Sequence, residues 1–113
     1  MINQTISAWG TKRTEETRKV EDVLRTSGFG RVDAYRYNSA SIRVRVIDPR
    51  FEGMSIEQRD EMVDQCLNGL PDRTQADIMN LLTFAPSEVN EQDKSFKTWL
   101  MNAEFEDPSP SHL

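Results

Sequence analysis

The chain has 113 residues, 36% of them apolar and 29% charged, with a formal net charge of -5. This length suits one domain, and the acidic balance argues against a protein that binds nucleic acid mainly through its phosphates. A single cysteine, Cys66, excludes an intramolecular disulfide. With one histidine, His112, the chain also has too few ligands for a Cys/His zinc site. The N-terminus shows no signal-peptide pattern and no stretch approaches the ~20 apolar residues of a membrane span, so we expect a cytoplasmic protein without membrane contact.

The N-terminal half predicts one helix and two strands after an N-terminal arm, residues 1–13. Residues 14–27 predict a helix that Thr14 caps and that Gly28 ends. Residues 31–37 and 41–47 predict two strands joined by a short turn. In the second strand the apolar side chains alternate with Arg43 and Arg45, which indicates a sheet with one dry face and one wet face. The residues assigned to the dry face are Val32, Ala34, Ile42, Val44 and Val46, and Tyr35 and Tyr37 are assigned to the other face.

The C-terminal half predicts a strong helix and a third strand. Ser55 and Gln58 fit a capping box. The helix carries one apolar stripe, which is made of Ile56, Met62, Val63, Cys66, Leu67 and Leu70. Residues 71–75 fit one further helical turn, and the dense apolar run in residues 76–84 predicts a buried strand. We therefore expect an α+β fold with a three-stranded sheet, helices on one face, and the order α-β-β-α-(α)-β.

The domain is expected to span residues 14–88, with an acidic C-terminal extension, residues 89–113, that includes a short helix over 94–102. Phe96, Trp99 and Leu100 share one face of that helix. Two interpretations stay open: the helix docks on its own domain, or Trp99 anchors a partner. Cys66 on the apolar stripe is interpreted as a packed, inert thiol, and His112 as a residue of the Pro/Ser tail.

Several short motifs resemble the BolA family. They are Asp48-Pro49-Arg50-Phe51-Glu52-Gly53, then Ser55 and Arg59, and Pro86-Ser87-Glu88 after the last strand. The resemblance covers about residues 15–88. It implies a fold similar to type II KH domains and pairing with a monothiol glutaredoxin through a shared [2Fe-2S] cluster. Some members of the family are described as DNA-binding regulators.

The chain departs from the family at the positions that serve the cluster. The family's Arg-His pair reads Arg59-Asp60 here, the ligand histidine before the last strand falls near Gln75, and the hairpin loop reads Asn38-Ser39. We therefore expect no bound cofactor, no metal site and no iron-sulfur cluster in the purified protein.

An arginine-rich surface is the main candidate binding site. The predicted partner-binding residues are Arg36, Arg43, Arg45, Arg50, Arg59 and Trp99. Arg43 and Arg45 share a strand face and Arg36 is expected across from them, with tyrosines nearby, a combination that suits nucleic acid or an acidic protein. The alternative is a solvated face neutralised by Asp33, Glu57 and Asp60, or a face covered by the acidic extension.

No catalytic residues are predicted, because no nucleophile has a usable base and no phosphate loop is present. We expect a non-catalytic protein-interaction module that resembles BolA, monomeric or weakly dimeric, with a regulatory or iron-sulfur-related role. The alternative is a KH-like protein that binds nucleic acid through the arginine-rich sheet face. The acidic balance and the lack of a Gly-x-x-Gly loop favour the first function.

Overall fold

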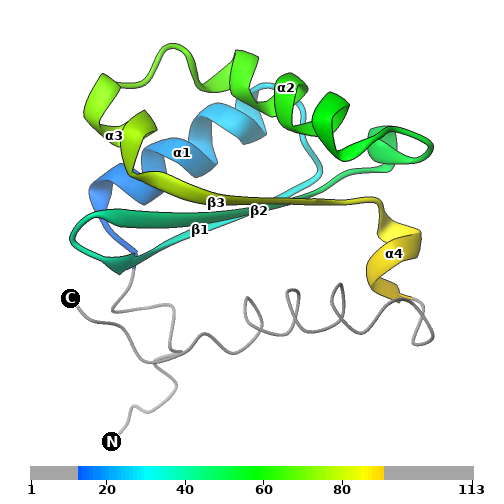
Figure 1. Ribbon diagram of the computed structural model, residues 1–113, viewed down its shortest axis with the longest axis horizontal. Coiled ribbons are helices and arrows are strands. Elements are labelled where there is room, and N and C mark those ends of the chain that lie inside the picture. Colours follow the sequence, from blue (N-terminus) through cyan, green and yellow to red (C-terminus); the bar gives the residue numbers. More distant parts are fainter. Residues whose placement is uncertain (1–12, 91–113) are drawn as a thin grey trace, which may run out of the picture.

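A three-stranded sheet with helices on one face makes up the computed structural model, which describes residues 13–90 (Figure 1). The elements in chain order are α1 (Glu15–Thr26), β1 (Arg31–Asn38), β2 (Ser41–Ile47), η1 (Pro49–Phe51), α2 (Ile56–Leu67), α3 (Asp72–Asp77), β3 (Ile78–Phe84) and α4 (Pro86–Asn90). The predicted α+β class and the order of its main elements are confirmed. The short 3-10 helix η1 and the helix α4 were not predicted.

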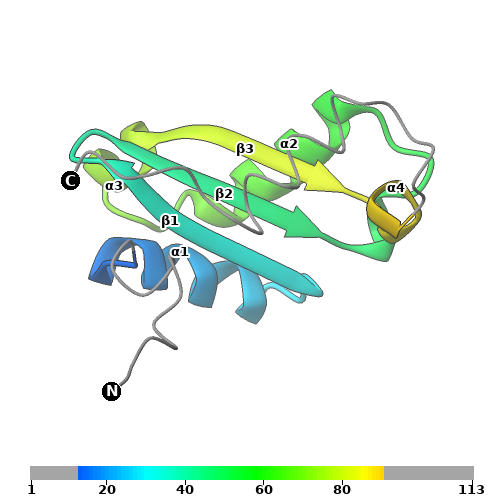
Figure 2. The same cartoon turned by 90° about the horizontal axis from the view of Figure 1, so that it is seen from below.

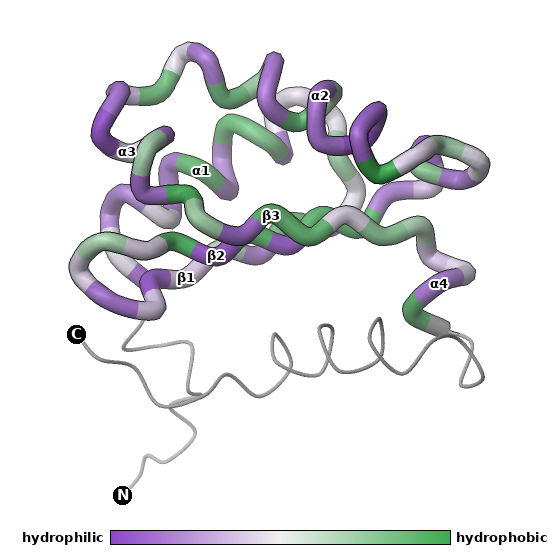
Figure 3. Tube along the Cα trace, viewed as in Figure 1, coloured by the Kyte–Doolittle hydropathy of each residue, from purple (hydrophilic) through white to green (hydrophobic). Residues whose placement is uncertain are grey.

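The sheet has the order β1-β2-β3, with β1 antiparallel to β2 and β2 parallel to β3. A parallel pair needs a long crossover connection, and α2 with α3 supplies it. Val32 lies opposite Val46 and Ala34 opposite Val44, so the alternating apolar side chains of both strands share one face. Figure 3 shows this alternation of hydrophobic and hydrophilic residues along the strands.

The core lies between that face and the helices. Helices α1, α2 and α3 lie on the same side of the sheet (Figure 1), and Figure 2 shows the opposite side with α2 and α3 behind the strands. The core residues are Val20, Leu24, Phe29, Val32, Ala34, Ile42, Val44, Val46, Phe51, Val63, Leu67, Leu70 and Ala85. The dry face that the sequence predicted is thus confirmed.

Helix α1 begins and ends as predicted. The Thr14 hydroxyl accepts from the Thr17 backbone N–H, and the Thr17 hydroxyl accepts from the Thr14 N–H, so a reciprocal capping box fixes the first turn. Two orphan N–H groups of the helix start are satisfied in this way. At the other end Gly28 has φ of 97°, a left-handed conformation that glycine adopts without strain.

Helix α2 confirms the predicted Ser55–Gln58 capping box. Its predicted apolar stripe is only partly right. Val63 and Leu67 are buried, but Ile56, the first residue of the helix, is 56% exposed. Gly53, with φ of 76°, makes the turn that leads into this helix.

The third strand differs from its prediction. Helix α3 runs to Asp77, so β3 begins at Ile78 and not at residue 76, and β3 lies at the edge of the sheet. Met79 is 64% exposed, so the prediction of a buried strand is wrong for the first part of β3. Pairing on one side alone explains this exposure, since an edge strand has a neighbour on one flank only.

The ends of the chain limit two further predictions. Helix α4 extends to Asn90, so the predicted domain boundary at residue 88 falls inside a helix. The predicted arm up to residue 12, the helix 94–102 with Trp99, and His112 lie outside the described residues. Within residues 13–90, no helix has the length and apolar character that crossing a bilayer requires.

Candidate interaction surfaces

The first candidate surface is the arginine face, which we define as the sheet face opposite α1, α2 and α3 with Asp33, Tyr35, Tyr37, Arg43 and Arg45. Strand alternation places these five side chains there, because their neighbours Ala34 and Val44 point into the core. The Arg43 guanidinium lies 3.9 Å from the centroid of the Tyr37 ring and donates to the Tyr35 hydroxyl at 3.0 Å. Cation–π contacts with both tyrosine rings and a hydrogen bond to Tyr35 therefore help to hold Arg43.

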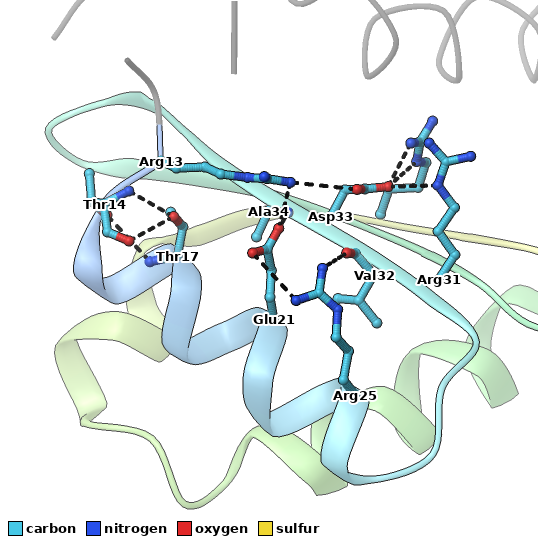
Figure 4. A network of polar contacts seen from close by, with 10 residues as sticks. Arg13, Thr14, Thr17, Glu21, Arg25, Arg31, Val32, Asp33 and Ala34 are labelled. Atoms are coloured by element: carbon cyan, nitrogen blue, oxygen red, sulfur yellow. Dashed lines mark hydrogen bonds and ion pairs between the residues drawn. The ribbon is translucent and has the colours of Figure 1, made fainter. Parts of the chain in front are cut away.

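Asp33 is the anionic centre of the arginine face. Its Oδ2 accepts from Arg45 Nη2 at 2.6 Å and from Arg31 Nε at 3.2 Å. The Arg13 guanidinium lies 3.7 Å from the other oxygen and pairs with Glu21 at 3.1 Å (Figure 4). Three guanidinium groups thus share the Asp33 carboxylate.

Burial on the arginine face is greater than a sheet face without helices would give. Tyr35 is 0% exposed and Arg45 is 1% exposed. The three helices that bury the core lie on the opposite side of the sheet (Figures 1 and 2). Tyr35 and Arg45 are therefore shielded from solvent by parts of the chain other than these three helices.

Arg36 does not belong to this surface, so its predicted position across from Arg43 and Arg45 is wrong. The register pairs Arg36 with Ile42, which places its side chain on the core side of the sheet. There the guanidinium reaches the edge of the core and pairs with Asp77 at 2.9 Å and with Glu16 at 3.6 Å. A long aliphatic stem lets an arginine lie along apolar surface while its charge meets an acid.

Arg50 belongs to the loop after β2 and is held within its own domain. Its Nε donates to Asp48 at 3.0 Å, and its guanidinium lies 4.4 Å from the Phe29 ring centroid. Burial alone would raise the pKa of Asp48, but the hydrogen bonds from Arg50 and from the Gly30 N–H together lower that pKa. The pair ties the start of β1 to the end of β2, and Arg50 keeps an exposed flank.

Arg59, 4% exposed, is a structural clamp between α2, β3 and α4. Two nitrogens donate to the two Glu88 oxygens at 2.8 Å each, and further bonds reach the carbonyls of Met54 and Thr83, both at 3.1 Å. The hydrogen bonds with Glu88 raise the pKa of Arg59. With its donors satisfied internally, Arg59 is poorly placed for the predicted role of contacting a partner.

The second candidate surface is the β3 groove, which we define as the hollow between α2, α3 and β3 lined by Asp60, Asp64, Leu67, Gln75, Met79 and Leu81 among others. Its volume is about 450 Å³. Asp60 Oδ1 is buried there without a hydrogen-bond partner. Burial raises the pKa of the Asp60 carboxyl, and the charges of Asp64 and Glu57 raise it further. The sequence reasoning missed this groove, because it assigned the third strand to the interior of the sheet.

The groove also brings together the two positions where the BolA resemblance places cluster-related residues. Asp60 and Gln75 both line it. The Gln75 amide donates to the carbonyls of Leu70 at 2.7 Å and Asn68 at 3.3 Å, so it holds the connection between α2 and α3. Cys66 is half-buried against the core, and its thiol lies 3.5 Å from the Met62 carbonyl.

Neither a search for metal-binding groups nor a comparison with known proteins assigns a function to these surfaces. Among residues 13–90 no group of three His, Cys, Asp or Glu side chains is placed to hold a metal ion. Comparison with family models, curated proteins and solved structures finds no match. The assignment of a function therefore depends on the chemistry of the arginine face and the β3 groove.

Proposed function

We propose that this chain is a non-catalytic protein-interaction module and that the arginine face is its recognition surface. The observation that carries the proposal is the concentration of arginine and tyrosine side chains on one face of the sheet, with the Arg43 guanidinium 3.9 Å from the centroid of the Tyr37 ring. Arginine and tyrosine side chains are enriched at protein interfaces.

The chemistry of the face selects an acidic segment with aromatic or aliphatic residues. The guanidinium groups of Arg13, Arg31 and Arg45 surround Asp33. Guanidinium groups are well matched to carboxylates, and the tyrosine rings offer contact area. Residues 91–113 have this composition in their own sequence, with five carboxylates near Phe96 and Trp99.

The BolA resemblance fits this proposal at the level of chain order. The described elements follow the order that the resemblance implies, with α2 and α3 between β2 and β3. A BolA-like module that binds a protein partner is therefore our preferred identity, with a monothiol glutaredoxin as the family's partner. The positions held by Asp60 and Gln75 favour an interaction that does not use a cluster.

The test compares two charge reversals in the full chain. Arg43→Glu changes the recognition surface, and Arg18→Glu makes the same change of charge on an exposed position of α1. We expect the wild type and the Arg18 variant to capture the same proteins. The Arg43 variant should bind these proteins more weakly, with a binding free energy less favourable by ~1–3 kcal/mol. Equal capture by all three proteins would refute the arginine face as the recognition surface. Arg45 is left unchanged, because burial beside Asp33 makes its reversal a change of stability.

Nucleic acid remains the competing occupant, and one contact argues against it. The Tyr37 ring is covered by the Arg43 guanidinium at 3.9 Å, so stacking a base on that face of the ring would first displace Arg43. Fluorescence anisotropy with labelled single-stranded RNA and DNA separates the two functions. Saturable binding that weakens steeply with salt and is lost in the Arg43 variant would favour the KH-like alternative.

A further inference from the structure

The two edges of the sheet are treated differently. At the β1 edge, side chains of α1 cap the backbone: Glu21 accepts from the Ala34 N–H at 3.0 Å, and Arg25 donates to the Val32 carbonyl at 3.0 Å (Figure 4). At the β3 edge, no side chain within residues 13–90 forms a hydrogen bond to the backbone of residues 78–82. Natural sheets block or cover an edge strand, so a bare stretch of edge is a template for another strand.

A β-bulge marks the bare stretch. The parallel register pairs Ile42 with Ile78 and Arg43 with Asn80, so Met79 is an extra residue in β3. Bulges occur next to binding sites, where they re-aim a side chain. Met79 lines the β3 groove and is 64% exposed, and with Ile56 it makes up the large apolar side chains exposed within residues 13–90.

We propose that the β3 groove is a second interaction surface, which takes an extended basic segment of a protein partner as a fourth strand beside residues 78–82. Backbone hydrogen bonds to the bare edge supply affinity, as in other cases of strand addition. Apolar side chains of the segment pack on Leu67, Met79 and Leu81, and a lysine or arginine reaches Asp60 and Asp64.

The charge of the groove decides the occupant. Asp60 and Asp64 lie one helical turn apart on α2, so both carboxylates border the groove, and Asp60 Oδ1 is buried without a partner. A buried acceptor with no donor costs free energy that a cation from a partner would recover. Nucleic acid is repelled by the same two carboxylates, and an acidic segment is better served by the arginine face.

The experiment uses the full chain and a synthetic probe. The probe is a fluorescein-labelled peptide of alternating lysine and valine, long enough to span residues 78–82. We expect saturable binding, with NMR shift changes in residues 78–82 and in α2. Asp60→Asn combined with Asp64→Asn should raise the dissociation constant about tenfold. The matched control, Asp22→Asn with Glu15→Gln, removes two exposed carboxylates on α1 and should leave binding unchanged.

A second probe tests the strand itself. Methylating the backbone nitrogens of the peptide keeps its side chains and removes its N–H donors, and we expect this version not to bind. The proposal is overturned if the methylated peptide binds equally well, if both double variants bind alike, or if the parent peptide shows no saturable binding. Concentration-dependent shifts of residues 78–82 without peptide would also overturn it, because a second copy of this chain would then be the occupant.

Discussion

Arg59→Met should lower the free energy of unfolding by about 3 kcal/mol, because it removes the clamp between α2, β3 and α4. Methionine keeps an unbranched stem beside Phe51 but loses four hydrogen bonds, to Met54, Thr83 and both oxygens of Glu88. Breaking a fully buried ion pair from one side costs roughly 3–5 kcal/mol. The Glu88 side chain is 30% exposed and can be partly hydrated, so the lower end of that range applies.

Urea unfolding followed by circular dichroism measures this loss, and thermal unfolding should show a Tm lower by ~12–24 °C for a domain of this size. Arg18→Met is the matched control, because Arg18 is exposed on α1 and should change stability by less than ~0.5 kcal/mol. Glu88→Gln keeps the oxygen that accepts from the Ala85 N–H and should cost less than Arg59→Met. A loss below about 1 kcal/mol for Arg59→Met would refute the clamp and return Arg59 to the candidate contact residues.

Three further substitutions test other parts of the fold. Gly53→Val should cost about 1–3 kcal/mol of unfolding free energy, because φ of 76° strains a β-branched residue although no atom lies within 4 Å of the added Cβ; an unchanged melting temperature would contradict this. Thr14→Ala should cost about 1 kcal/mol by removing the capping box with Thr17, which urea unfolding can detect. Asp60→Asn should stabilise the protein at neutral pH, because burial and the charge of Asp64 raise the Asp60 pKa in the folded state. That gain should vanish in acid, where the wild type binds the proton both folded and unfolded, and a variant less stable at pH 7 would show that the charge of Asp60 supports the fold.

Local patterns predicted the parts of the fold that local physics determines. The alternation in residues 41–47 placed Arg43 on the face opposite the core, and the Ser55–Gln58 pair marked the start of α2. The same parity assigns Arg36 to the side of Ala34, so the expectation that Arg36 lies across from Arg43 did not follow the alternation. An arginine on the core side of a sheet is stable when its guanidinium reaches an acidic side chain at the edge of the core, as Arg36 reaches Asp77.

The position of a strand within the sheet is a tertiary property that the apolar run of β3 did not contain. Seven residues rich in leucine, isoleucine and methionine are compatible with a central strand, and only pairing shows that β3 has one neighbour. The role of Arg59 was hidden for the same reason, because its partner Glu88 comes 29 residues later, in a helix that no pattern predicted. Both failures concern contacts between distant parts of the chain, and both changed the candidate site.

Satisfied and unsatisfied polar groups separate the structural charges of this chain from those that await a partner. The donors of Arg59 and Arg36 are taken up within the domain, so their removal should act on stability first. Asp60 is the opposite case, since its Oδ1 is buried without a donor and its neighbours repel its charge. An asparagine there would remove the cost of burying the charge beside Asp64 and Glu57, and a group kept at the expense of stability is expected where it serves binding. Asp60→Asn is therefore expected both to stabilise the fold and to weaken binding of the lysine–valine peptide. Such a conflict between stability and recognition is what we expect if the β3 groove is a binding site.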